Sequence, residues 1–84
     1  MMNNKELLLN INKIHTTKLG HERIIKNLQL TEIDVVEYLK KRVLNENCKT
    51  YKKGKNYYCQ IDNIIVTINS HNYCIITAHL IKSR

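Results

Sequence analysis

Four histidines are the clearest candidates for acid–base chemistry in this chain of 84 residues. His71 and His79 both fall in the segment NSHNYCIITAH, and His15 lies in the first quarter of the chain. An imidazole of ordinary pKa accepts or donates a proton at neutral pH. Two of them can serve as base and acid when a ribose 2′-hydroxyl attacks its neighbouring phosphate. Surface histidines without a catalytic role would give the same pattern.

The last hydrophobic segment alternates in the way that a β-strand does. Alternation predicts that one face carries Tyr73, Ile75, Thr77 and His79. It predicts that the face packed against helices carries Cys74, Ile76, Ala78 and Leu80. On an open face, Thr77 would position a phosphate or a 2′-hydroxyl, and His79 would transfer the proton. The alternative is a half-buried strand with an ordinary polar face.

The segment YKKGKNYY interleaves basic and aromatic side chains around a predicted turn. Lysines bind phosphates and tyrosine rings stack on the bases of single strands. The residues expected to bind nucleic acid are Lys52, Lys53, Lys55, Tyr57 and Tyr58, together with Tyr73. An edge hairpin that uses Lys against aggregation and Tyr for cross-strand packing is the alternative.

A second candidate anion site lies where His15 and two threonines precede a predicted helix. Backbone N–H groups at a helix N-terminus favour an anion, and Arg23 could add a bidentate phosphate contact. Ordinary capping by Thr16 or Thr17 explains the same residues. The chain has no H-E-x-x-H motif and no Cys/His pair at zinc spacing, so neither a metal nor a cofactor is expected.

Apolar residues at helical spacing predict two to three helices in the first half. The first predicted helix carries Leu7, Leu8, Ile11 and Ile14, and the second carries Leu19, Ile24, Ile25 and Leu28. The third is predicted to start at Thr31 with Asp34 in a capping-box arrangement. Its buried face would be Ile33, Val36, Leu39, Val43 and Leu44.

The second half changes to strand periodicity, with turn residues at 53–55, 62–63 and 70–72. Four short segments separated by such turns predict an antiparallel β-meander. The expected fold is therefore α+β, in which two to three N-terminal helices pack on a four-stranded antiparallel meander. One domain spanning residues 1–84 is expected.

The formal net charge of +7 is concentrated in the second half of the chain. Residues 1–47 carry a net +2, whereas residues 48–84 carry +5 with Asp62 as their single acid. This distribution favours a polyanionic partner such as RNA. The three cysteines form no C-x-x-C pair, and no apolar run is long enough for a signal peptide or a membrane span. A cytoplasmic location without a membrane is expected.

The segments HTTKLGHERIIKNL, DVVEYLKK, KGKNYYC and VTINSHNYCIITAH resemble a family of short bacterial proteins known as a domain of unknown function. The resemblance runs from about His15 to Lys82. More loosely, the order of elements is similar to toxin domains of the barnase–EndoU–colicin–RelE group. That likeness implies a metal-independent ribonuclease, with His15 and Arg23 matching its helical positions and Thr77 and His79 its last strand.

Three hypotheses follow for the function. The first is a small RNA-cleaving, toxin-like domain in which His79 and either His71 or His15 act as acid and base, while Arg23 stabilises phosphate charge. The second is a non-catalytic module that binds nucleic acid or a protein through its basic half. The third is a structural domain in which the free sheet edge or face pairs two copies.

Overall fold

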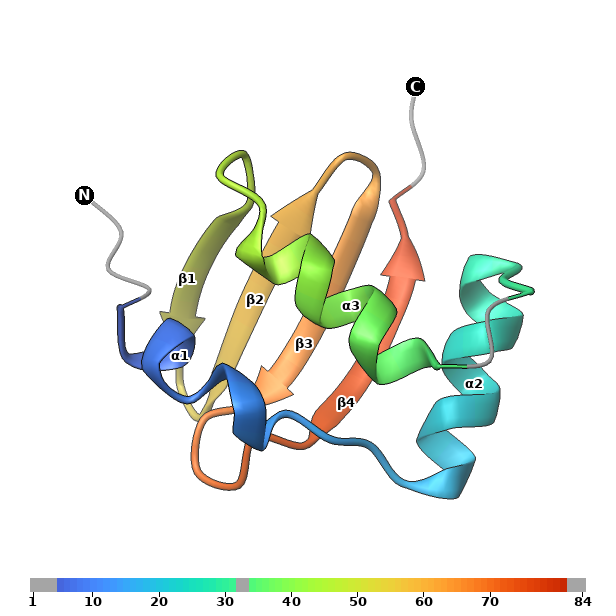
Figure 1. The fold of residues 1–84 in the computed structure, drawn as a ribbon, viewed down its shortest axis with the longest axis horizontal. Helices are drawn as coiled ribbons and strands as arrows, with labels where there is room; N and C mark the ends of the chain where they lie inside the picture. The colour runs from blue at the N-terminus through green and yellow to red at the C-terminus, as the bar shows by residue number, and fades with distance from the viewer. Residues whose placement is uncertain (1–4, 32–33, 82–84) are drawn as a thin grey trace.

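The computed structural model describes residues 5–31 and 34–81. In these residues, helical elements precede a four-stranded sheet (Figure 1). The helical elements are α1 (Lys5–Leu9), the 3-10 helix η1 (Ile11–Lys13), α2 (Lys18–Leu28) and α3 (Val35–Leu44). The strands are β1 (Lys49–Lys53), β2 (Asn56–Ile61), β3 (Ile64–Asn69) and β4 (Ile75–Leu80). The predicted α+β class is confirmed.

The sheet is an antiparallel meander in the order β1-β2-β3-β4. Tight turns join β1 to β2 and β2 to β3, because Lys53 pairs with Asn56 and Ile61 pairs with Ile64. Gly54 has a φ of 62°, a left-handed conformation that a residue with a side chain adopts at a cost. The predicted hairpin breaks are confirmed, and the connection between β3 and β4 is longer than the other two.

The register between β3 and β4 shifts by one residue. Thr67 pairs with Thr77 but Ile68 pairs with Ile75, which leaves Ile76 as an extra residue. Such a bulge reverses the faces of the residues that precede it. Ile75 is accordingly 2% exposed and belongs to the core, whereas Ile76 is 45% exposed. The predicted alternation of this strand is therefore wrong before Thr77.

Helix α2 lies beside β4 (Figure 1). Its N-cap is Thr17, whose Oγ1 accepts a hydrogen bond from the Gly20 N–H at 3.0 Å. Gly20, Ile24 and Leu28 are the buried residues of this helix. Leu19 is 67% exposed, so its predicted place in the apolar stripe is wrong. Gly20 takes the buried position in its place, where an added Cβ would lie 2.5 Å from Thr16 Oγ1.

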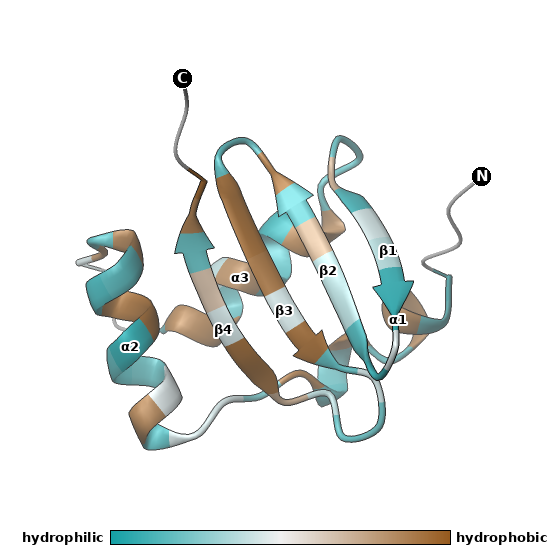
Figure 2. Cartoon of the chain, turned by 180° about the vertical axis from the view of Figure 1, so that it is seen from behind, coloured by the Kyte–Doolittle hydropathy of each residue, from teal (hydrophilic) through white to brown (hydrophobic). Residues whose placement is uncertain are grey.

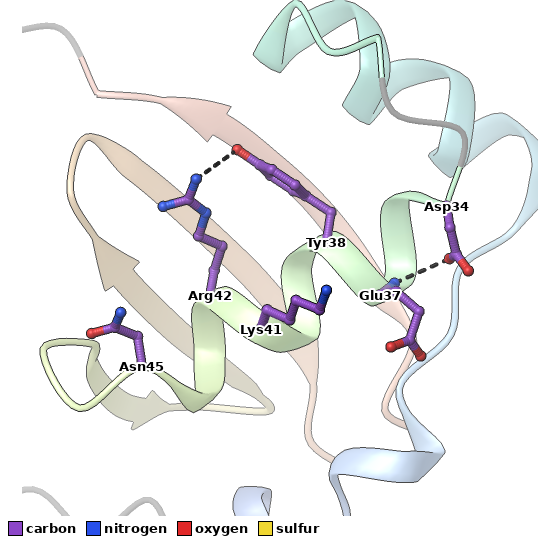
Figure 3. A pocket seen from close by; sticks show the side chains of 6 residues that line it. All are labelled: Asp34, Glu37, Tyr38, Lys41, Arg42 and Asn45. Atoms are coloured by element: carbon purple, nitrogen blue, oxygen red, sulfur yellow. Dashed lines mark hydrogen bonds between the residues drawn. The ribbon is translucent and has the colours of Figure 1, made fainter.

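Helix α3 begins at Val35 rather than at Thr31. Asp34 is the N-cap, and its Oδ1 accepts a hydrogen bond from the Glu37 N–H at 3.1 Å (Figure 3). Thr31 is exposed and precedes the helix, so the predicted start was about one turn too early. Ile33, which was expected on the buried face, lies outside the described residues.

One face of the sheet is covered and the other is open. Helix α3 crosses the sheet on the near side in Figure 1, with α1 on the same side, and the view from behind shows the strands uncovered (Figure 2). The buried residues of α3 are Val35, Leu39 and Val43. Leu44, predicted to join them, is 55% exposed at the end of the helix. The open face is therefore the part of the sheet that a large ligand can reach.

The fully buried core lies between the helices and the covered face. Its largest side chains are Leu7, Ile24, Leu39, Ile68, Val35, Val43, Val66 and Cys59. None of the helices in residues 5–31 and 34–81 has both the length and the apolar character that crossing a membrane demands.

Candidate nucleic-acid interface

A polar and aromatic row crosses the open face on all four strands. Tyr51 pairs with Tyr58, Tyr58 with Thr67, and Thr67 with Thr77. The next row of register partners points to the opposite side and is buried, and it consists of Thr50, Cys59, Val66 and Ala78. Because neighbouring residues on a strand face opposite sides, the first row lies on the open face, although Thr67 in its middle is buried.

Tyr51 and Tyr58 form an aromatic platform on this row. Their ring centroids are 5.3 Å apart, and their planes differ by 22°. Tyr51 is 40% exposed, and the Tyr58 hydroxyl accepts a hydrogen bond from Asn56 Nδ2 at 3.4 Å. Tyr58 was expected to stack on a base, and it lies on the accessible side of the sheet. The platform presents a ring surface of the kind on which bases stack.

A second row on the open face begins with Lys49 and ends with His79. Lys49 pairs with Gln60, Gln60 with Ile65, and Ile65 with His79. Both end residues are exposed. The predicted position of His79 on the open face is therefore correct, and Thr77 lies half-buried in the adjacent row.

The three lysines predicted to bind nucleic acid do not share one face. Lys53 follows Tyr51 by two residues and so lies on the open face, as Lys49 does. Lys52 is the register partner of Tyr57 and faces the covered side. Lys55 is exposed in the β1–β2 turn, where its carbonyl accepts a hydrogen bond from the Ser70 N–H at 2.8 Å.

Tyr57 and Tyr73 belong to the core rather than to the open face. They are 2% and 8% exposed, and their ring centroids lie 6.5 Å apart. The Tyr57 hydroxyl donates a hydrogen bond to Glu6 Oε1 at 3.0 Å. Burial, and then this hydrogen bond, raises the pKa of Tyr57 to about 12. The expected position of Tyr73 on the open face is wrong, because Tyr73 precedes the bulge and has a φ of 60°.

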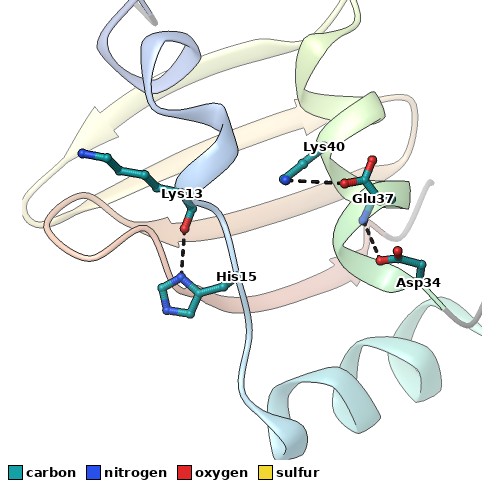
Figure 4. A network of polar contacts seen from close by, with 5 residues as sticks. All are labelled: Lys13, His15, Asp34, Glu37 and Lys40. Atoms are coloured by element: carbon teal, nitrogen blue, oxygen red, sulfur yellow. Dashed lines mark hydrogen bonds and ion pairs between the residues drawn. The ribbon is translucent and has the colours of Figure 1, made fainter.

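His15 lies beside the segment that leads into β4, where it forms an isolated parallel bridge with Cys74. The His15 N–H donates to the Tyr73 carbonyl at 3.2 Å, and the His15 carbonyl accepts from the Ile75 N–H at 2.7 Å. Its side-chain Nδ1 lies 2.9 Å from the carbonyl of Lys13 (Figure 4). Since a carbonyl oxygen only accepts, Nδ1 carries the proton in this contact.

The structure does not bring the three candidate histidines together. His71 is exposed in the loop that precedes β4, where its N–H donates to Asn69 Oδ1 at 2.7 Å. His15 is beside Cys74, whereas His79 lies near the other end of β4. Five residues of strand separate Cys74 from His79, which corresponds to about 15 Å. An acid and a base that act on one phosphate must both reach it, whereas His15 and His71 lie toward the other end of β4 from His79.

Arg23 is exposed on α2 and flanks β4. Asn27, four residues later, donates from Nδ2 to the carbonyl of Ala78 at 3.3 Å. Gly20, three residues earlier, lies close to the carbonyl of Ile75. Residues three and four apart share one side of a helix, so Arg23 lies on the side of α2 that meets β4. Arg23 thus borders the sheet between its two ends.

The open face is basic, because its strand positions carry Lys49 and Lys53 and no acidic residue. Asp62 is the one acidic residue in positions 48–81. Its Oδ2 accepts a hydrogen bond from Arg42 Nη1 of α3 at 2.9 Å. This ion pair directs the carboxylate toward the helix-covered side. Lys49, Lys53 and His79 therefore face solvent without a neighbouring acid on their own face of the described sheet.

A surface hollow of about 520 Å³ lies along the outer side of α3 (Figure 3). Its lining residues are Asp34, Glu37, Tyr38, Lys41, Arg42 and Asn45. Acidic and basic groups compensate one another here, as in the Glu37–Lys40 ion pair of 3.4 Å on the same helix (Figure 4). None of the residues predicted to bind or cleave nucleic acid lines it, so the hollow is separate from the open face.

The structure adds three residues to those expected to bind nucleic acid, although Tyr51 already belonged to the YKKGKNYY segment. Lys49, Tyr51 and Gln60 lie on the open face, and all three are exposed. Counting every second residue back from Lys53, the last residue before the turn at Gly54, would have found Tyr51 and Lys49. Within residues 5–31 and 34–81, no three His, Cys, Asp or Glu side chains gather in a way that could hold a metal ion.

A family model described as "Protein of unknown function (DUF3781)" matches this chain. It covers residues 8–79. Neither the curated proteins nor the solved structures gave a match. The resemblance to a family of unknown function is confirmed, and a similarity to toxin ribonucleases is not shown. The chain belongs to the DUF3781 family.

Proposed function

We propose that this protein binds single-stranded nucleic acid, without cleaving it, on the open face of its sheet. The observation that carries the proposal is the stacked pair Tyr51 and Tyr58 between exposed lysines on a face without acids. Stacking on an aromatic ring contributes about 1–3 kcal/mol per base and tolerates any sequence. The lysines supply the phosphate contacts that give such binding its salt dependence.

The placement of the lysines supports the same conclusion. Lys49 and Lys53 lie two residues on either side of Tyr51, which is about 6–7 Å along the strand in each direction. A ligand that stacks on Tyr51 is thus within reach of both ammonium groups. Duplexes bury their bases, so a platform of this kind discriminates in favour of single strands.

The test is a fluorescence anisotropy titration with a labelled single-stranded RNA of mixed sequence. Tyr51→Ala is expected to weaken binding about fivefold or more, since one stacking contact is lost. The matched control is Tyr38→Ala, which removes a tyrosine from the hollow along α3, away from the open face. Equal affinities for the wild type and Tyr51→Ala would refute the platform.

A metal-independent ribonuclease is the second candidate, favoured by the exposure of His79 on the open face next to the row of Thr77. His79 would act there without the help of His15 or His71, which lie toward the other end of β4. Incubation of the protein with mixed RNA in EDTA, beside His79→Ala, separates the two candidates. Cleavage that the variant loses would establish the nuclease. Salt-sensitive retention without cleavage would support the binding module.

A further inference from the structure

Two cysteines meet on the covered side of the β1–β2 hairpin. Thr50 is the direct register partner of Cys59, and Cys48 precedes Thr50 by two residues. Cys48 Sγ lies 3.6 Å from Thr50 Oγ1, so the Cys48 side chain points to the same face as Thr50. Both thiols are free in this structure, and the Thr50 side chain interacts with each of them. The hairpin register thus brings together two sulfur atoms that are far from a C-x-x-C spacing.

The two thiols have unlike surroundings. Cys48 is partly exposed, whereas Cys59 is fully buried. A hydrogen bond from Cys59, helped by Thr50 and opposed by burial, lowers the pKa of Cys48 to about 7. The same hydrogen bond, and then burial, raises the pKa of Cys59. One thiol is therefore accessible and readily ionised, and the second is held beside it in the neutral form.

We infer that Cys48 is a peroxide-sensitive thiol and that Cys59 resolves its oxidised form into a Cys48–Cys59 disulfide. The Cys48 thiolate attacks one oxygen of hydrogen peroxide and breaks the O–O bond, which leaves a sulfenic acid and, after protonation, one water. The Cys59 sulfur then attacks the sulfenic sulfur, and a second water leaves with the thiol proton. Two thiols are oxidised and one peroxide is reduced.

Cys48 lies one residue before the first pair of the β1–β2 ladder. The Cys48 N–H donates to the carbonyl of Asn45 at 3.0 Å, in the turn before β1. Because the β1–β2 ladder begins at Lys49, a shift of Cys48 toward Cys59 breaks none of the ladder's hydrogen bonds. Disulfide formation requires such an approach, because the Cα atoms of two bridged cysteines lie within about 7 Å of each other.

Cys74 provides an internal control. It directly precedes β4, which is two strands away from the strand of Cys59 in the sheet order. Its thiol donates to the carbonyl of Ile75 at 3.7 Å rather than contacting another sulfur. If oxidation followed from a general loss of structure, Cys74 would be oxidised as readily as the other two cysteines. The inferred reaction leaves Cys74 reduced.

The experiment treats the reduced native protein with stoichiometric hydrogen peroxide, blocks the remaining thiols with N-ethylmaleimide and maps unreduced peptides by mass spectrometry. The expected product joins Cys48 to Cys59, carries maleimide on Cys74 and reverts with dithiothreitol. The Cys74→Ser variant should give the same product, and Cys48→Ser should give no intramolecular disulfide. In Cys59→Ser, a dimedone adduct should form at Cys48.

Three results would overturn the inference: a disulfide that contains Cys74, Cys48 oxidised to sulfinate with Cys59 still reduced, or a native protein that keeps all three thiols. Peptide mapping of the native chain decides among them even if Cys59→Ser does not fold. A second measurement is the rate of alkylation by iodoacetamide at neutral pH. Cys48 should react about tenfold faster than an unstructured cysteine peptide, in proportion to its thiolate fraction.

Discussion

The ring of Tyr51 stacks on the ring of Tyr58 across the β1–β2 hairpin, with centroids 5.3 Å apart. A cross-strand aromatic pair stabilises a hairpin, but Tyr51 remains 40% exposed and can stack on a further ring. Tyr51→Phe is therefore expected to keep the affinity for single-stranded RNA, since stacking needs the ring rather than the hydroxyl. Tyr51→Leu should bind single-stranded RNA about fivefold or more weakly in an anisotropy titration. Equal binding by the leucine variant would exclude base stacking.

The raised pKa of Tyr57 predicts a loss of stability at alkaline pH. Its folded-state pKa is raised to about 12, while the unfolded value is about 10. The folded protein keeps the phenol proton that the unfolded chain releases, so this contribution is complete below pH 10 and disappears as the pH rises toward 12. The free energy of unfolding, measured with denaturant at pH 8 and pH 11, should decrease less for Tyr57→Phe than for the wild type. Tyr51→Phe, at an exposed tyrosine, is the control, and its free energy of unfolding should decrease as much as that of the wild type.

The N-cap of α3 can be tested at two positions. Asp34→Ala removes the acceptor of the 3.1 Å bond from the Glu37 N–H and should cost about 1 kcal/mol of the free energy of unfolding. Thr31→Ala should change this free energy by less than about 0.5 kcal/mol, because Thr31 is exposed ahead of the helix. Urea denaturation of both variants checks this. A larger loss at Thr31 would contradict the observed helix start.

Gly20 and Thr16 should be energetically coupled. A Cβ at Gly20 would lie 2.5 Å from Thr16 Oγ1, a buried oxygen without a hydrogen-bond partner in the part of the chain described. Gly20→Ala is therefore expected to destabilise by about 1–3 kcal/mol despite the better helix propensity of Ala. Adding Thr16→Ala should recover part of the loss in a double-mutant cycle. Strict additivity of the two changes would contradict the close contact between Gly20 and Thr16.

Local patterns predicted the meander because its turns are encoded by short-range chemistry. The tight turn at Gly54 requires a left-handed residue, and the segments on either side have the period of a strand. The start of α3 was harder to predict, since Thr31 and Asp34 are both good N-cap residues. Only the hydrogen bond to the Glu37 N–H distinguishes them.

The faces of β4 could not be predicted from alternation alone. The bulge at Ile76 results from the register with β3 and from the bridge of His15 to Cys74, and both are contacts between distant segments. Tyr73 thereby enters the core. The separation of the histidines has the same origin, because the position of His15 depends on tertiary contacts.

The most direct measurement of the central claim is the salt dependence of single-stranded RNA binding in two variants of one strand. Lys53→Gln removes a charge from the open face, and Lys52→Gln removes the same charge from the covered side. Lys53→Gln should weaken binding and reduce the slope of log affinity against log salt by about one, as expected for one lost phosphate contact. Lys52→Gln should leave the slope close to that of the wild type. Equal effects of the two substitutions, or binding that does not respond to salt, would contradict an interface on the open face of the sheet.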